Sequence, residues 1–363
     1  MSPGPDARWF TQVALTLLAA LAAAGLCVAV GTPIPWLLGP LVVTGLASVA
    51  GAPTASAGVL RNTGQWIIGT ALGLYFTPQV GAFVLQTGWA IALGVLWSLL
   101  LGLVFGLWLQ RRHAQDLASL SPAQQRATTY FASPIGGASE MTMLAERAGA
   151  RTDLVAAAHS LRLVMVVLSV PFLMQWAQTH WGLTVDESLR PQPRPAQWPG
   201  LLWLGMATLA GGWVMRRLGR TNPWFMGALL VAMGLSLFDV QWSAVPPVLS
   251  NAAQLFIGIS LGVRFRRDFI QTAPRWMASA AIGTLALMLL SAGFAFLLAW
   301  GTGLHPATLV LGTSPGGITE MAITAKVLQL GVPIVTAFQV SRLVAVLMLA
   351  GPLYRWVHLR GAG

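Results

Sequence analysis

Long apolar stretches, each able to cross a lipid bilayer as a helix, dominate this sequence. Three of them, at residues 10–31, 80–109 and 276–301, reach or exceed the roughly 20 residues that a transmembrane helix needs. Only 9% of the 363 residues are charged and 56% are hydrophobic, whereas about a quarter of the residues in a soluble globular protein are charged. We therefore expect an all-α polytopic membrane protein.

The basic residues fit the same interpretation. A net charge of +11 would suggest nucleic acid in a soluble domain, but here Lys and Arg lie in short clusters between apolar segments. Such loops anchor a protein at membrane lipid, so we expect membrane lipid and no nucleic acid among its partners. The single cysteine, Cys27, excludes an intramolecular disulfide and a cysteine metal cluster.

Three blocks of residues recur in the same order in the two halves of the chain. They pair residues 34–39 with 222–227, 62–76 with 251–265, and 133–141 with 314–321. In the third block both copies carry Ser-Pro, two glycines and Glu-Met, and each glutamate is followed by an arginine inside an apolar stretch. An internal repeat of this length predicts two copies of one structural module. We assign the first repeat to 1–176, a polar Pro-rich connector to 177–198, and the second repeat to 199–363.

The distribution of basic residues predicts how the two repeats are oriented. Each half offers six apolar segments, and if all twelve crossed the membrane, Lys and Arg would divide evenly between its two sides. If the Ser-Pro-Gly-Gly segment of each half instead enters and leaves the membrane by the same face, nearly all loop Lys and Arg fall on the cytoplasmic side. We therefore expect two inverted repeats, each with about five transmembrane helices plus one re-entrant or broken Ser-Pro-Gly-Gly segment. Both termini are then cytoplasmic.

The Ser-Pro-Gly-Gly segments are the first candidate site. Pro followed by two glycines breaks a helix and leaves backbone groups that must be buried in protein or line a wet cavity. A half-helix that starts beyond the break directs its positive end at the loop, which favours an anion. Alternatively, the segments only pack closely against their neighbours. The candidate residues are Ser133, Gly136, Gly137, Ser139, Ser314, Gly316, Gly317 and Thr319, and we expect Ser139 and Thr319 to cap the new half-helices.

The charged residues of the repeats are the second candidate. Counting the helical rise along each hairpin puts Glu140 level with Arg162, and Glu320 level with Arg342. Charges inside a membrane are costly and usually paired, so we expect two Glu–Arg bridges. Either these bridges only fasten each hairpin to its neighbouring helix, or the glutamates relay a proton or cation and the arginines bind carboxylates.

A further repeated element combines amides with Gly-x-x-x-Gly. Gln65 and Gln254 each precede such a pattern, at 69–73 and 258–262. The glycines favour close helix packing, and the amides favour hydrogen bonds across the contact, with the glutamines also candidates to face a central cavity. The five histidines are scattered, without ligand spacing, so we expect no metal site, no cofactor and no enzymatic activity.

These repeated blocks resemble the AbrB-like family of bacterial membrane proteins, which is known for an internal duplication. The resemblance covers about residues 10–358, and the first copy departs from it by an inserted Ile135. It implies a polytopic protein of the bacterial inner membrane. Family members carry labels such as ammonia monooxygenase and regulator of gene expression. The residues that such labels would require, metal ligands or a DNA-binding element, are not evident in this sequence.

Taken together, the patterns favour a transporter for a small anionic or carboxylated solute, coupled to protons or sodium. The motivating pattern is a pair of broken segments in inverted repeats. One alternative is a membrane sensor that regulates gene expression through a partner, and a less favoured one is a membrane enzyme of the ammonia monooxygenase type. Whether the chain forms a homo-oligomer is left open.

Overall fold

A computed structural model of the chain describes residues 7–181, 195–220, 222–240, 242–265 and 273–359. Within these residues the chain forms fifteen helices and no strands, which confirms the all-α prediction. Most of the expected connector at 177–198 lies outside the described residues, so its structure is untested. Seven of the helices begin at a proline, whose fixed φ and missing N–H suit the first helical position.

Fewer helices than expected are long enough to span a membrane. Five in the described residues pass by length and apolar composition, or six if a pair of helices bent by 86° counts as one. The five are α1 (Ala7–Val30), α5 (Gly88–Arg112), α8 (Thr152–Trp181), α13 (Pro274–Thr302) and α16 (Val332–Leu359). A multi-pass membrane protein is supported, but the ten full spans are not. The shorter helices, of 15 or 16 residues, cover only about 24 Å at 1.5 Å per residue.

The apolar run at 80–109 is divided, contrary to the single segment predicted for it. Helix α4 (Pro78–Gln86) ends and α5 begins on either side of Thr87. The polar Gln86 and Thr87, followed by a glycine, interrupt the run where hydropathy alone bridges it. The bent pair is formed by α3 (Gly58–Gly73) and α4.

The described helices belong to two compact units, and each unit takes segments from both halves of the sequence. Unit 1 comprises Met1–Leu85, Pro171–Arg267 and Ala322–Pro333, and unit 2 comprises Gln86–Val170, Asp268–Met321 and Ile334–Gly363. Unit 1 therefore holds α1, α2 (Pro35–Val49), α3, α4, α9 (Trp198–Arg217), α10 (Pro223–Leu237) and α11 (Pro247–Gly262). Each compact unit thus combines segments from both halves of the chain, and the two repeats and their boundaries remain a prediction.

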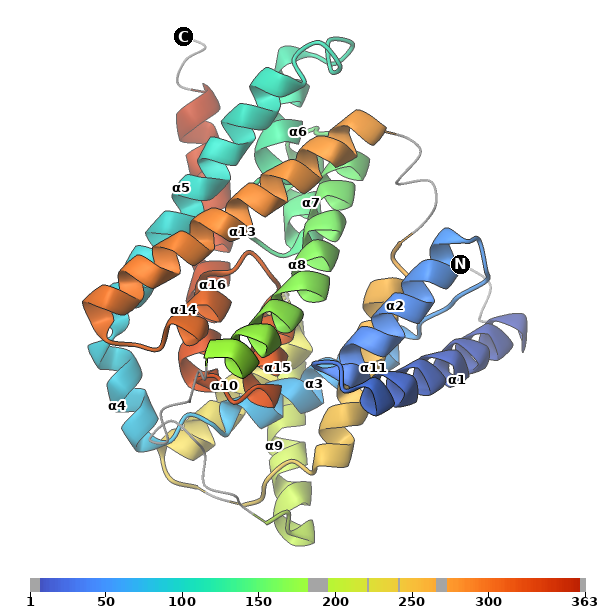
Figure 1. Cartoon of the computed structure of the whole chain (residues 1–363), viewed down its shortest axis with the longest axis vertical. Helices are drawn as coiled ribbons and strands as arrows, with labels where there is room; N and C mark the ends of the chain where they lie inside the picture. Colours follow the sequence, from blue (N-terminus) through green and yellow to red (C-terminus); the bar gives the residue numbers. More distant parts are fainter. Residues whose placement is uncertain (1–6, 182–194, 221, 241, 266–272, 360–363) are drawn as a thin grey trace. The chain divides into compact units, whose positions relative to one another are not determined.

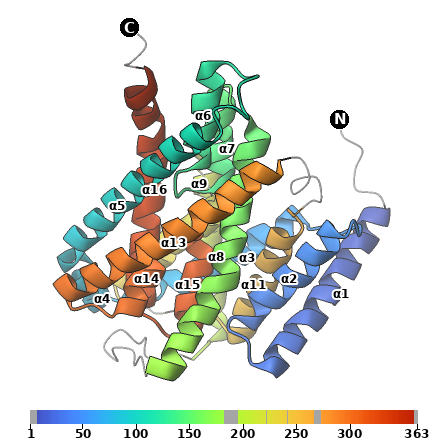
Figure 2. The same cartoon turned by 45° about the horizontal axis from the view of Figure 1, so that its top comes forward.

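Unit 1 is held together by close helix crossings at glycines. Helix α2 packs beside α1 and α11, as Figures 1 and 2 show, and α10 packs against α3 and α9. A Cβ at Gly73 would lie 2.6 Å from the Leu229 carbonyl oxygen, and a Cβ at Gly262 would lie 2.7 Å from that of Leu41. These contacts join corresponding residues of the two halves. The packing role predicted for the Gly-x-x-x-Gly patterns is confirmed.

Unit 2 contains the broken helices. It holds α5, α6 (Pro122–Ala132), α7 (Ala138–Arg147), α13 and α14 (Pro306–Thr313), while α8, α15 (Ile318–Val327) and α16 carry residues of both units. Helix α5 contacts α6 and α13, and α13 contacts α14. A buried apolar cluster that includes Phe105, Tyr130, Phe131 and Leu287 joins α5, α6 and α13. The first broken helix therefore shares an apolar core with two long helices.

Candidate functional site

Both Ser-Pro-Gly-Gly segments are broken helices, as predicted. Residues 133–137 separate α6 from α7, and residues 314–317 separate α14 from α15. Pro134 and Pro315 supply no N–H and do not continue a helix, so the helix ends at each of these prolines and a new helix begins a few residues later. The last carbonyls of α6 and α14 lose their helical partners there, and buried carbonyls need other donors.

Arg162 provides these donors in the first copy. Its Nη1 donates to the Ser133 carbonyl oxygen at 2.9 Å and its Nη2 to that of Pro134 at 2.8 Å. The Nη2 group also contacts Nδ1 of His159, one turn earlier on α8, whose Nε2 lies 2.8 Å from the Phe131 carbonyl oxygen. Arg162 is only 4% exposed. A guanidinium and an imidazole therefore fasten the end of α6 to α8.

Arg342 does the same in the second copy. It donates to the carbonyl oxygens of Ser314 at 2.6 Å and Gly316 at 2.7 Å. Its Nη2 also donates to Oε1 of Gln339 at 2.5 Å, and Nε2 of Gln339 donates to the Leu311 carbonyl oxygen at 2.7 Å. Arg342 is 5% exposed. Both copies thus place one arginine and one neutral polar side chain on the broken end of a helix.

Sequence reasoning missed His159 and Gln339. Each lies three residues before its arginine, so the two side chains share a helix face. A polar residue at this spacing before an intramembrane arginine, repeated in both halves, was the available signal.

The predicted Glu–Arg bridges are not formed. Within the described residues neither Arg162 nor Arg342 makes an ion pair with a carboxylate, and both guanidinium groups bind neutral acceptors. The helical rise places Glu140 and Glu320 at the same depth in the membrane as the arginines. Equal depth does not determine the direction in which each side chain points around its helix axis. Both glutamates do lie in the first turn of their half-helices, as predicted.

The glutamates fold back over the start of their own helices. A Cβ at Gly137 or at Gly317 would run into the carboxylate of the glutamate three residues later. A carboxylate is favoured at this end of a helix by the helix dipole. The capping prediction is wrong, because Gly137 and not Ser139 caps α7, and because Thr319 lies inside α15, which starts at Ile318. Ser139's side chain lies outside the described part.

The two broken segments approach each other's arginine-bearing helix. A Cβ at Gly316 would lie 2.9 Å from Val166 Cγ1 on α8, and a Cβ at Gly136 would lie 3.0 Å from Val346 Cγ1 on α16. The charge of one guanidinium also acts on the other. The two breaks therefore converge within unit 2, with glycines where no side chain fits.

The hydroxyl groups of both Ser-Pro pairs are engaged by protein. Ser133 Oγ donates to the Tyr130 carbonyl oxygen at 2.7 Å, and Ser314 Oγ donates to Met321 Sδ at 3.1 Å. Both serines are buried. Their side chains support the breaks in this conformation.

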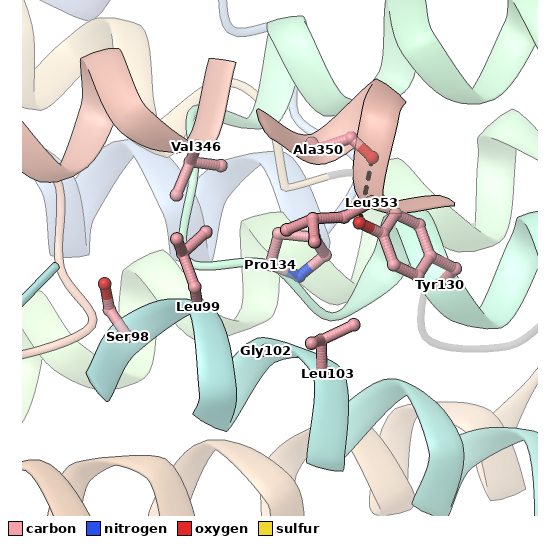
Figure 3. Close-up of a pocket in the computed structure, with 9 residues that line it drawn as sticks. All are labelled: Ser98, Leu99, Gly102, Leu103, Tyr130, Pro134, Val346, Ala350 and Leu353. Carbon is pink, nitrogen blue, oxygen red and sulfur yellow. Dashed lines mark hydrogen bonds between the residues drawn. The ribbon is translucent and has the colours of Figure 1, made fainter. Parts of the chain in front are cut away.

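A small cavity lies beside the first break (Figure 3). It offers about 10 Å³ to the centre of a water-sized molecule, close to the minimum for one water. Pro134, Gly102 and Val346 line it, and Tyr130 closes one end by donating a hydrogen bond of 2.8 Å to the Ala350 carbonyl oxygen. The lining is almost entirely apolar, so the cavity is a packing gap next to the site.

The two glutamines belong to the other unit. Gln65 Nε2 donates to Asn222 Oδ1 at 2.7 Å, which confirms the predicted cross-helix hydrogen bond. Gln254 is 3% exposed, and its Oε1 has no hydrogen-bond partner in the described residues. Both lie in unit 1, whereas the converging breaks described above lie in unit 2.

A Ser–His–Asp chain that sequence reasoning did not find links α5 to α13. His113 Nδ1 lies 2.8 Å from Asp116 Oδ2, and His113 Nε2 lies 2.9 Å from Ser279 Oγ. The hydrogen bond with His113 lowers the pKa of the Asp116 carboxyl below its usual value. Ser279 is only 6% exposed, and the Trp276 ring lies 5.1 Å from the imidazole, centroid to centroid, at an interplanar angle of 58°. A nucleophile must be accessible, so this chain acts as a tether between helix ends.

Comparisons with known proteins find one family model and two similar proteins. The family model described as "Transition state regulatory protein AbrB" matches residues 36–358. A Bacillus subtilis (strain 168) protein named "Uncharacterized protein YhjN" is 28% identical over 354 residues, covering 90% of this chain and 88% of that protein. The "Putative regulator AbrB" of Escherichia coli (strain K12) is 26% identical over 357 residues, covering 97% of both chains.

Proposed function

The chain belongs to the AbrB family, and from this premise we propose that it is a membrane transporter for a small anionic or carboxylated solute. One observation carries the proposal: two buried guanidinium groups lie within electrostatic reach of each other and, in the described residues, bind only neutral acceptors. Buried charges normally have a partner of opposite sign. An anionic solute would supply it.

The backbone around the arginines favours the same ligand. Helices α7 and α15 begin at the breaks, and a helix start attracts negative charge. Arg342 Nε is buried and has no hydrogen-bond partner among the described residues, so one donor remains for a ligand. A solute carboxylate at this point would meet two cationic groups and two helix ends.

Transport requires the solute-binding site to open alternately to the two sides of the membrane. In transporters built from inverted repeats, one set of helices moves against the other around a central site formed by broken helices. We propose that the Ser-Pro-Gly-Gly breaks are this central site. Glu140 and Glu320, at the starts of the half-helices, are then the candidates to carry a coupling proton or sodium ion.

We place the protein in the bacterial inner membrane, with both termini in the cytoplasm and with lipid and the solute as its partners. The basic loops predict this orientation. It is tested by attaching a reporter enzyme to each terminus, and a periplasmic signal from either terminus contradicts it.

The decisive experiment is uptake of small radiolabelled carboxylates and inorganic anions into liposomes containing the purified protein. Arg342→Lys keeps the positive charge and loses the bidentate hydrogen bonding of the guanidinium group. We expect it to reduce uptake roughly tenfold or more, since charge-assisted hydrogen bonds are worth about 1.5–3 kcal/mol. Arg112→Gln, which removes an exposed charge on α5, is the matched control and is expected to transport normally. Absence of uptake and binding for every solute of a broad panel contradicts the proposal.

The names of the family and of its Escherichia coli relative favour a second candidate, regulation of gene expression by a membrane sensor. Such a sensor needs a partner that carries the output. It predicts that exposed cytoplasmic arginines, such as Arg216 and Arg217 at the end of α9, are required for the transcriptional response and not for solute binding. A transcriptional response that persists in the Arg216→Ala/Arg217→Ala variant excludes this candidate.

We propose further that the chain is not an enzyme. A membrane monooxygenase predicts stoichiometric copper or iron in the purified protein, so elemental analysis tests this view directly. Finding either metal at one equivalent overturns it.

A further inference from the structure

The two arginines differ in the side chain that supports them. His159 stands in the first copy where Gln339 stands in the second, each three residues before its arginine. Both accept from the guanidinium, and both donate to a carbonyl oxygen in the last turn of the helix before the break. The hydrogen bonds match, but of the two side chains only the imidazole can take up a proton.

The contacts determine the protonation state of His159. The Phe131 carbonyl oxygen can only accept, so Nε2 must carry a hydrogen. The Arg162 guanidinium can only donate, so Nδ1 must offer its lone pair. A neutral imidazole satisfies both partners. A second proton on Nδ1 would set an N–H against the guanidinium N–H and place two positive charges in contact.

No carboxylate in the described residues compensates such a proton. Helix α6 presents the Phe131 carbonyl and, next to it, Tyr130, whose hydroxyl is bonded to Ala350. Glu140 of α7 lies over its own helix start, and α16 contributes Tyr354, which contacts the Phe131 ring. Among charged groups, Arg162 is the one that acts on His159. Protonation therefore drives the arginine away or recruits an anion.

We propose that His159 is a positioning residue that ties the placement of Arg162 to protonation. Neutral His159 holds the guanidinium on the carbonyls of the first break, and protonated His159 releases it toward the solute. The second break stays fixed, because the Gln339 amide does not titrate. This inference rests on the proposed function for its purpose, and it identifies the proton as the coupling ion.

The chain supplies its own control. His159→Gln copies the second site into the first: the amide nitrogen can still donate to Phe131 and the amide oxygen can still accept from Arg162. Gln339→His is the reciprocal change. Both variants keep the hydrogen bonds, so they are expected to fold at neutral pH.

The first measurement is the thermal unfolding midpoint of the purified protein in detergent between pH 7.5 and 5. We expect acid to lower the wild-type midpoint by about 3–5 °C more than that of His159→Gln, since only the wild type opposes protonation at this position. Gln339→His is expected to steepen the pH dependence. The other histidines are present in all three proteins, so the difference between the wild type and His159→Gln isolates position 159, and the difference between the wild type and Gln339→His isolates position 339. Coinciding profiles of the wild type and His159→Gln overturn the proposal.

The second measurement is nitrogen-15 NMR of histidine-labelled protein in nanodiscs, with His159→Gln assigning the resonance. At pH 8 the Nε2–H tautomer is expected, and the Nδ1–H tautomer overturns the proposal. Neither measurement needs a solute. A failure of liposome uptake with intact pH profiles therefore counts against transport alone, whereas coinciding pH profiles count against the role of His159 alone.

Discussion

The two broken helices share a backbone design and differ in their surroundings. In the second copy every residue of α15 from 318 to 325 is buried, whereas α7 in the first copy exposes one face. The first copy carries the inserted Ile135 and the titratable His159, and the second carries Gln339. The shared arginine contacts are therefore what the break itself requires. The differences show where the copies are free to take different roles.

The largest expected effect is the loss of an arginine. Arg342→Ala leaves two buried acceptors, the Gly316 carbonyl oxygen and Gln339 Oε1, without their donor, at about 1–3 kcal/mol each. The Ser314 carbonyl oxygen keeps only the 3.3 Å bond from Gln339 Nε2, so unfolding should become easier by about 3 kcal/mol or more. Arg162→Ala should have a similar effect, because it removes the donors of the Ser133 and Pro134 carbonyl oxygens. Unfolding midpoints in detergent measure both, with exposed Arg112→Ala as control. Equal unfolding midpoints for Arg342→Ala and the control would contradict the claim that the break requires its arginine.

Ile135 provides the next effect, which only the first copy can show. Its side chain is 2% exposed and belongs to the apolar cluster of unit 2, so the inserted residue fills core space. Ile135→Ala should destabilise the protein by about 2–4 kcal/mol. Ile282→Ala, on an exposed face of α13, is the control. If both variants unfold at the same temperature, the insertion is not part of the core.

Smaller effects are expected from the glycines at the helix starts. Gly317→Ala pushes a methyl group against the Glu320 carboxylate and places it 3.3 Å from Leu163 Cδ1, at a cost of about 1–3 kcal/mol. Gly137→Ala should cost less, because the partly exposed Glu140 can turn aside. Midpoints of both variants are compared with Gly293→Ala, where a Cβ meets nothing within 4 Å. A larger loss for Gly137→Ala than for Gly317→Ala would reverse the expected order.

The smallest effect concerns the carboxylate charges. Glu320→Gln removes a favourable charge from the start of α15 at about 0.3–1 kcal/mol, and Glu140→Gln should cost less in its more exposed position. In liposomes the same variants test whether either glutamate carries the coupling ion. Unchanged uptake at all pH values and sodium concentrations would exclude both glutamates from that role.

Features with a local cause were predictable from the sequence. Apolar length predicts helices, and Pro followed by two glycines predicts a break, because both act within a few residues. The positions of both glutamates in the first turn of a half-helix follow from the same breaks. The close approach at Gly73 and Gly262 follows from the missing side chains.

The arginines' partners were not predictable in the same way. Every residue carries a carbonyl oxygen, so nothing in the amino-acid sequence distinguishes Ser133 or Gly316 as an acceptor. The helical rise gives the depth of a side chain in the membrane but not its direction around the helix axis. The rule that buried charges are paired therefore led to the prediction of carboxylate partners instead. The division into units was also hidden, because it depends on contacts between segments far apart in the sequence.

That division affects how the protein can be made. Helix α3 packs on α10, and about 160 residues separate their ends, so at roughly 5–20 residues per second the ribosome needs about 8–30 s to deliver the partner. During this interval the glycine faces of the early helices have only lipid or a chaperone to cover them. A gene truncated after the first repeat would yield neither unit, so the two halves are expected to restore a stable protein only when they are synthesised together.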